Sequence, residues 1–476
     1  MTLDPMRIAW FTPWPPQRSG VAGRSAEIVP LLCAAGHGID VFVDEHHVDI
    51  TRRSDEQPPL PGRLRVQSAH DVVWRARQRH YDVAVYQIGN STTHEFIWPY
   101  LFRWPGLAVL HDTHLHHARG RALLLRKRVD EYRAEFAWNH PGVPARAAEL
   151  AVRGFDGAYY YDWPMVRSVV ATSRLVATHS PGARVALQEA WPDHEFDSIV
   201  LAEGCRVAPS EADRAAVREA LAIPDSAVVF GVFGGLSAEK RVPQVLRAFA
   251  ETSARVPEAV LVLAGRRDAS VDVSGLIRSL GIAHATRVLE TLNDAEFDRT
   301  IAAVDVSLNL RWPTAREMSG PWVRALAAGR ATVIVDLVHL ALIPSLDPRT
   351  WHTHAPGGAS VTGQGPVTVA IDILDEDHSL HLAMRRLAVD HEWRKQLGRA
   401  ARRHWEAEHS FERVVRDYER AMSRAAQLPD PTGERPAHLR PSSLVQAREL
   451  GSAFGAETAA IINDLESSQD AHHAQR

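Results

Sequence analysis

Four residues within one short segment have the types and spacing of a site for a phosphate or a sugar. They are Arg311, Glu317, Ser319 and Gly320. The segment follows an apolar, β-branched run at 304–310, and it precedes a helical run at 321–329 and a second strand pattern at 331–336. Ligands bind outside the carboxyl ends of strands in such βαβ units, and a helix start attracts anions, so we predict a ligand site here. A surface loop with an N-cap serine would show the same pattern.

A second segment, 232–241, has the residues to bind a diphosphate. It follows a strand pattern and contains Gly234, Gly235, Lys240 and Arg241. Glycines let the backbone approach a ligand closely, and the two cations can stabilise negative charge on a leaving phosphate. A solvated helix start would give the same pattern alone. Its position ahead of Glu317 in the same α/β repeat makes the diphosphate interpretation more specific.

A third group lies where a strand pattern at 107–112 ends in His111 and Asp112. A histidine at this place can donate a hydrogen bond to a ligand, although it can also be a buried core residue. The following run contains His114, His116 and His117, but the spacing matches no zinc signature. We therefore predict no metal site.

The elements that must position these groups begin with a strand pattern at 7–12, a proline-rich turn and a helix. Gly20 in that turn would let the backbone approach a ligand, or would merely ease the entry into the helix. Residues 113–170 are mostly helical in pattern and include an aromatic cluster. Its members Tyr160, Tyr161 and Trp163 could stack on an acceptor sugar, although packing is the commoner role of such residues.

The Glu317 segment resembles the nucleotide-sugar signature of the retaining family 4 glycosyltransferases (glycosyl transferases group 1), which have the GT-B fold. The family pattern is a glutamate, a glycine-rich turn and a second glutamate before a helix end made of small residues. Glu317 matches the first glutamate, which in the family lies against the donor sugar. Arg324 stands where the family has the second, which usually binds the ribose hydroxyls.

The second segment resembles the phosphate-binding motif of the same family. Gly234 and Lys240 match it, whereas Gly235 replaces the usual arginine and Arg241 replaces the usual glycine. The resemblance implies an α/β, GT-B protein with two Rossmann-like domains facing a central cleft, and C-terminal helices that cross back to the N-terminal domain. It covers about residues 6–425.

The resemblance also implies transfer of a hexose from a nucleotide-diphosphate sugar to an acceptor hydroxyl, with retention of anomeric configuration and without a metal or other cofactor. The acceptor would be a glycan, a lipid-linked saccharide or a small glycoside. The implied catalytic residues are His111, Asp112 and Glu317. The implied donor-binding residues are Gly20, Gly234, Gly235, Lys240, Arg241, Arg311, Ser319 and Gly320.

A length of 476 residues is too great for one core. We expect an N-terminal Rossmann-like domain on the acceptor side at 1–200 and a donor-side Rossmann-like domain at 201–390. Crossover helices would follow at 391–426, and a polar, mobile tail at 427–476.

Composition excludes some classes of partner. The 54 Lys and Arg residues nearly balance the 58 Asp and Glu residues, so we expect no nucleic-acid partner. Cys33 and Cys205 show neither disulfide nor zinc spacing, and no apolar run or signal peptide indicates a membrane span or secretion. A cytoplasmic protein is expected. Peripheral contact with the inner membrane face and the oligomeric state stay open.

Two other functions are compatible with parts of the sequence. Because Gly235 and Arg324 depart from the donor pattern, the chain could be a related binding or scaffolding protein without turnover. A Rossmann dehydrogenase would also be α/β, but no G-x-G-x-x-G fingerprint follows the first strand.

Overall fold

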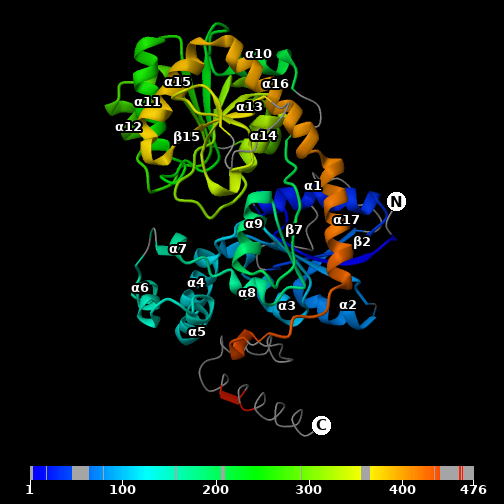
Figure 1. Ribbon diagram of the computed structural model, residues 1–476. Coiled ribbons are helices and arrows are strands. Elements are labelled where there is room, and N and C mark those ends of the chain that lie inside the picture. Colours follow the sequence, from blue (N-terminus) through cyan, green and yellow to red (C-terminus); the bar gives the residue numbers. More distant parts are fainter. Residues whose placement is uncertain are drawn as a thin grey trace. The chain divides into compact units, whose positions relative to one another are not determined.

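The structure is a computed structural model. It describes residues 4–17, 19–45, 64–78, 80–155, 157, 159–204, 209–290, 292–354, 365–433, 435–439, 460–461 and 464. The chain divides into two compact units (Figure 1). Unit 1 consists of residues 1–177 and 421–476, and unit 2 of residues 178–420. The expected boundary at 200 lies within unit 2.

The first sheet has the strand order β3-β2-β1-β4-β5-β6-β7. Its strands are β1 (Arg7–Phe11), β2 (Gly38–Val43), β3 (Leu64–Ser68), β4 (Val83–Ile88), β5 (Leu107–Leu110), β6 (Leu175–Thr178) and β7 (Phe196–Ser198). β1 pairs in parallel with β2 and β4, and β4 with β5. The apolar strand β5 is buried throughout, as is typical of a parallel sheet covered on both faces. The carboxyl ends of β1, β4 and β5 therefore share one edge.

The helices of this part of the chain are α1 (Gly20–Ala34), α2 (Val72–Gln78), α3 (Ile97–Arg103), α4 (His116–Leu125), α5 (Val129–Asn139), α6 (Ala148–Val152), α7 (Tyr159–Asp162), α8 (Arg167–Val170) and α9 (Pro181–Ala190). Ser19 caps α1 because its Oγ accepts a hydrogen bond from the Ala22 N–H over 3.0 Å. The predicted strand, turn and helix at the start of the chain are confirmed, and so is the helical character of 113–170.

The second sheet has the order β10-β9-β8-β11-β12-β15-β13-β14. Its strands are β8 (Val229–Phe233), β9 (Val260–Ala264), β10 (Thr286–Leu289), β11 (Val306–Leu308), β12 (Ala331–Val335), β13 (Ser345–Leu346), β14 (Thr353–His354) and β15 (Thr368–Ile371). β11 pairs in parallel with β8 and with β12. The segments that follow β8, β11 and β12 therefore leave the same edge of the sheet.

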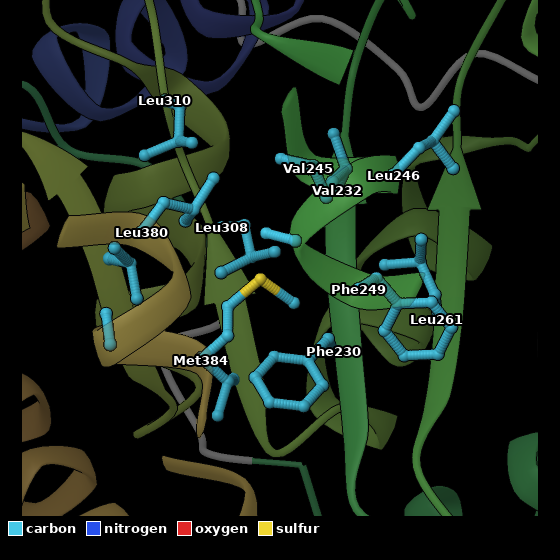
Figure 2. Packing of buried hydrophobic residues seen from close by; sticks show 14 of the residues in the cluster. Phe230, Val232, Val245, Leu246, Phe249, Leu261, Leu308, Leu310, Leu380 and Met384 are labelled. Atoms are coloured by element: carbon cyan, nitrogen blue, oxygen red, sulfur yellow. The ribbon is translucent and has the colours of Figure 1, made fainter. Parts of the chain in front are cut away.

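The remaining helices are α10 (Glu211–Ala220), α11 (Val242–Arg255), α12 (Val273–Ser279), α13 (Asp294–Ala303), α14 (Gly320–Ala327), α15 (Glu376–Val389), α16 (His391–Glu408) and α17 (Phe411–Gln427). In the core of unit 2, Phe230 meets Phe249 edge to face at 6.4 Å, and Met384 of α15 lies beside Phe230 (Figure 2). Gly329 ends the turn after α14 with a φ of 64°. The predicted βαβ unit around Glu317 is confirmed as β11-α14-β12.

Part of the segment expected to be a mobile tail is packed. Its short 3₁₀ helix η7 (Ala437–Leu439) belongs to unit 1. Leu439 is fully buried, and His438 Nε2 lies 2.8 Å from Glu135 Oε1 of α5. The composition of this segment did not predict these contacts.

Candidate functional site

The loop between β11 and α14 holds a charged pair at the carboxyl edge of the second sheet. Arg311 forms an ion pair with Glu317, whose side chain is 12% exposed. Thr314 Oγ1 donates a hydrogen bond to Glu317 Oε2 over 2.8 Å. The structure thus brings together two of the predicted site residues and fixes the glutamate from two directions.

The first turn of α14 begins beside a buried carboxylate. Ser319 Oγ accepts a hydrogen bond from the Trp322 N–H over 3.4 Å, which caps the helix. A Cβ atom on the next residue, Gly320, would lie 2.5 Å from Glu203 Oε2, so a larger residue there would force the glutamate side chain to shift. Glu203 is 5% exposed. The helix start predicted to bind a phosphate or sugar therefore already has an anionic neighbour, which the sequence did not reveal.

Arg324 holds this carboxylate in place. Its Nε donates a hydrogen bond to Glu203 Oε2 over 3.1 Å, and one terminal nitrogen donates to Asp298 Oδ1 over 2.7 Å. The Arg324 side chain is 13% exposed. The arginine that replaces the family's second glutamate therefore neutralises two largely buried carboxylates, and one of them belongs to the neighbouring helix α13.

We expect Arg324→Met to lower the free energy of unfolding by about 2–4 kcal/mol, because Glu203 and Asp298 would both lose the hydrogen bonds that the Arg324 guanidinium donates to them. Urea denaturation at neutral pH measures the change. Arg299→Met is the matched control, since Arg299 is exposed on α13 and has no ion pair among the described residues. We expect that control to change stability by less than about 0.5 kcal/mol. Equal stability of the two variants would contradict a stabilising role for Arg324.

Lys240 lies at the carboxyl end of β8, where its amine is buried. Nζ donates a hydrogen bond to the Phe233 carbonyl over 2.6 Å. Gly234 has a φ of 91°, which favours glycine, and a Cβ on it would lie 2.3 Å from Nζ and displace the lysine side chain. Burial, and secondly the charge of Arg311, lower the Lys240 pKa to about 7, against a smaller opposite effect of Glu317. Lys240, Arg311 and Glu317 thus act on one another electrostatically.

Gly235 and Arg241 occupy different surroundings. A Cβ on Gly235 would meet nothing within 4 Å, so open space adjoins this residue. Arg241 caps α11 with a φ of 57°, and its guanidinium forms a bidentate pair with Glu376 at the start of α15. The Arg241 side chain is therefore engaged in joining two helices, and the structure does not bring it to Lys240.

His339 lines the same region but was not predicted. It lies in the short helix η5 (Val338–Leu340), just after β12, and a cavity of about 20 Å³ lies between it, Arg311, Glu317 and Ser319. The ring is buried, which lowers its pKa to about 4. A histidine within the otherwise apolar run at 337–343 was the available signal, since a buried polar residue needs a partner.

In unit 1, His111 follows β5 and is held at both ring nitrogens. Nδ1 lies 2.6 Å from a terminal nitrogen of Arg24, and Nε2 lies 2.8 Å from Gln87 Oε1. Because a guanidinium can only donate, Nδ1 must accept and Nε2–H must donate. Arg24 lies one helical turn after Gly20 on α1, and a Cβ on Gly20 would be 3.9 Å from it. The structure thus brings Gly20 and His111 to one edge of the sheet, joined by Arg24.

Asp112 and a second histidine complete this group. Asp112 Oδ2 accepts a hydrogen bond from the Asn90 N–H over 2.6 Å. His94, which is 2% exposed, has its Nδ1 2.8 Å from the Gln87 carbonyl, and burial lowers its pKa to about 4. Sequence reasoning missed Arg24, Gln87 and His94. Two of them could have been predicted: Arg24 from its helical spacing to Gly20, and Gln87 because it is a polar residue within an apolar strand.

The aromatic residues proposed for an acceptor lie around α4 and α5. Tyr160 stacks on the ring of His117 at 4.5 Å, and Tyr161 meets the same ring edge-on at 5.3 Å. Trp163 packs against Phe136 at 5.4 Å, within a hydrophobic cluster of unit 1. Tyr160 packs against the same cluster, and all three side chains are half-buried.

Within the described ranges, no three His, Cys, Asp or Glu side chains come together in a way that could hold a metal ion. Cys33 is buried, and Cys205 lies outside the described residues. None of the described helices has the length and apolar character needed to cross a membrane.

No protein-family model matches the chain, and no curated protein matches it. Solved structures do. Sucrose-phosphate synthase from Thermosynechococcus elongatus aligns with a TM-score of 0.60 at 14% identity, over 87% of this chain and 98% of the other. WaaG, a glycosyltransferase involved in lipopolysaccharide biosynthesis, aligns with a TM-score of 0.57 at 12% identity, over 88% and 100%.

HepE from Anabaena, in complex with UDP and glucose, aligns with a TM-score of 0.55 at 15% identity, over 88% of this chain and 99% of the other. Identities this low establish the fold alone. The chain has the GT-B fold, and the predicted fold class is confirmed.

Proposed function

We propose that the chain is a glycosyltransferase that moves a hexose from a nucleotide-diphosphate sugar to an acceptor hydroxyl, with retention of anomeric configuration. The observation that carries this proposal is Lys240, a buried amine beside Gly234 at the carboxyl end of a parallel strand. Its charge is costly in the unliganded protein, as its lowered pKa shows. A diphosphate beside it would restore a favourable environment for that charge.

The chemistry needs positive charge at the leaving group. The acceptor oxygen forms a bond to the anomeric carbon while the bond from that carbon to the diphosphate oxygen breaks, and the hydroxyl proton passes to the departing phosphate oxygen. Attack on the face from which the diphosphate leaves gives retention. Lys240 stabilises the charge that develops on the diphosphate, which is the principal catalytic contribution, and the proposal requires no metal or other cofactor.

The positions of Glu317 and Gly320 indicate which part of the donor each region of the site binds. Glu317, oriented by Arg311 and Thr314, binds hydroxyls of the donor sugar. Because Glu203 adjoins Gly320, we assign the diphosphate to Lys240 rather than to the first turn of α14.

His111 and Asp112 are proposed as catalytic residues because they stand at the carboxyl end of β5. Tyr160, Tyr161 and Trp163 are proposed for a saccharide or lipid-linked acceptor because aromatic faces stack on sugars. The relatives' ligands support the donor class, since HepE was solved with UDP and glucose and starch synthase IV from Arabidopsis thaliana with ADP and acarbose.

Thermal stabilisation by UDP-, GDP-, ADP-, TDP- and CMP-sugars tests the proposal. A ligand at 100 times its Kd stabilises the folded state by about 2.7 kcal/mol, which raises the melting temperature by several degrees. We expect one nucleotide to stand out and the same donor to be consumed when acceptor sugars are added. The absence of both a shift and turnover with every donor would contradict the proposal.

A second function is favoured by one specific observation. Arg324 donates hydrogen bonds to two carboxylates, and one of them, Glu203, places negative charge beside the start of α14. That charge would disfavour an anionic nucleotide at this helix start. Under this alternative the chain is a binding or scaffolding protein with little turnover. Tight donor binding without hydrolysis or transfer would support it over the enzyme.

A further inference from the structure

His339 has one ring nitrogen with no partner in a buried position. The side chain lies in η5, directly after β12, and is 5% exposed. Its Nδ1 is inaccessible to solvent and forms no hydrogen bond within the described part of the chain. Buried polar atoms in native proteins are nearly always paired with protein, water or ligand, so this nitrogen calls for a partner other than the described residues.

The chemistry of the ring defines what that partner must be. Burial holds the pKa of His339 at about 4, so the ring is neutral at physiological pH. The backbone of Glu317 opposes this lowering of the His339 pKa, as a carbonyl does when it faces a ring N–H. A neutral imidazole has one donor and one acceptor nitrogen. In the tautomer in which Nε2 carries the proton, Nδ1 is an acceptor.

The space beside the ring has the size of one hydroxyl group. The cavity of about 20 Å³ is lined by His339, Asn309, Arg311, Glu317 and Ser319, together with apolar residues of β12 and η5. A cavity of this volume accommodates about one water molecule. Asn309 Nδ2 already donates a hydrogen bond to the Ser307 carbonyl. Glu317 forms an ion pair with Arg311 and accepts a hydrogen bond from Thr314. Among the described groups in this cavity, the one that still lacks a hydrogen-bond donor is therefore His339 Nδ1.

We infer that His339 Nδ1 accepts a hydrogen bond from one hydroxyl of the donor hexose, in a subsite shared with Glu317, and that His339 thereby helps to determine which sugar is accepted. The inference rests on the proposed function, because it names a contact within the same donor site. A site that hydrogen-bonds a substrate hydroxyl discriminates strongly against the analogue that lacks it, since the buried acceptor is then left unpaired.

The wild-type protein provides the first test. The best nucleotide-sugar donor is compared with its series of monodeoxy analogues, measuring donor affinity and, where there is turnover, kcat and KM. We expect one analogue to bind about tenfold more weakly or worse, and affinity for the free nucleoside diphosphate to be independent of this contact.

Two variants assign that contact to His339. His339→Leu removes the acceptor, so we expect the donor KM to rise about tenfold and the discrimination against that one analogue to disappear. His339→Asn places an amide oxygen near the position of Nδ1 and is expected to recover most of the affinity. Binding of the nucleoside diphosphate alone is expected to stay unchanged in both variants, which controls for misfolding.

The outcomes separate the inference from the proposed function. If His339→Leu keeps the full wild-type pattern against all deoxy analogues, the cavity holds only a structural water and the inference is overturned. If the wild type binds nucleotide sugars without transferring the hexose, the proposed activity fails while the affinities still decide the role of His339. If neither nucleotide sugars nor nucleoside diphosphates bind, both are wrong.

Discussion

Lys240→Met is expected to reduce kcat/KM for the donor by about 100-fold or more, the effect typical of removing one group that stabilises a developing anion. Methionine keeps much of the volume of the partly buried side chain while removing the charge. The rate is measured as nucleoside diphosphate released with the best donor. Lys395→Met, at an exposed position on α16, is the matched control and is expected to retain full activity.

The pH dependence of donor binding identifies the lysine independently of the rate. The pKa of Lys240 in the free protein is about 7, and the diphosphate of a nucleotide sugar, being a diester, does not titrate near neutrality. Binding requires the cationic form, so the dissociation constant rises by up to about tenfold for each pH unit above 7. Lys240→Met is expected to bind weakly at every pH, with no such dependence.

Stability provides the control for folding. Because the pKa of Lys240 falls from 10.5 to about 7 on folding, the unfolded chain binds more protons between these values. Wild-type stability therefore rises with pH across this window, and the full penalty applies below pH 7. We expect Lys240→Met to be at least as stable as the wild type at pH 6.5, with its relative advantage shrinking toward pH 10. If Lys240→Met were inactive because it is unfolded, it would instead be less stable than the wild type at pH 6.5.

The sequence predicted those parts of the fold and of the site that depend on local pattern. The apolar runs and capping residues around β11, α14 and β12 are local signals, and they placed Glu317, Ser319 and Gly320 correctly at a carboxyl edge of the sheet. Lys240 was likewise found because the glycine turn that holds it lies within a few residues of it.

What the sequence could not predict depends on partners far away along the chain. Arg241 has the same local pattern as Lys240, but its carboxylate partner Glu376 comes from α15, 135 residues later. Glu203 is paired with Arg324 across 121 residues. Local spacing contains no information about such contacts. The identity of a cation as ligand-binding or structural is therefore settled only by the fold.

In unit 1 the same limit applies to His111. Its position at the end of β5 was predicted, but its hydrogen bond to Arg24 spans 87 residues and that to Gln87 spans 24. The unliganded ring is fully engaged. For His111 to form a hydrogen bond with a sugar, one of these two hydrogen bonds has to be replaced. The only N–H of the ring donates to Gln87, so His111 can donate to a sugar only by giving up the bond to Gln87.

Glu317→Gln is expected to lower kcat/KM for the donor by about 10–100-fold, since a charge-assisted hydrogen bond to a sugar hydroxyl becomes a neutral one. The amide keeps the shape and the contact with Thr314. The charge of Glu317 also raises the Lys240 pKa, so its removal lowers that pKa further. The pH above which donor binding weakens is therefore expected to move to a lower value.

Arg311→Gln completes the argument because its effect on Lys240 has the opposite sign. The positive charge of Arg311 lowers the Lys240 pKa, so removing it raises that pKa and moves the midpoint of donor binding to a higher pH. Isothermal titration between pH 6 and 9 measures both shifts. Opposite shifts in the two variants, both absent when Lys240→Met is added, would tie the three side chains to one donor site. Shifts of the same sign would contradict this assignment, because Glu317 raises the Lys240 pKa and Arg311 lowers it.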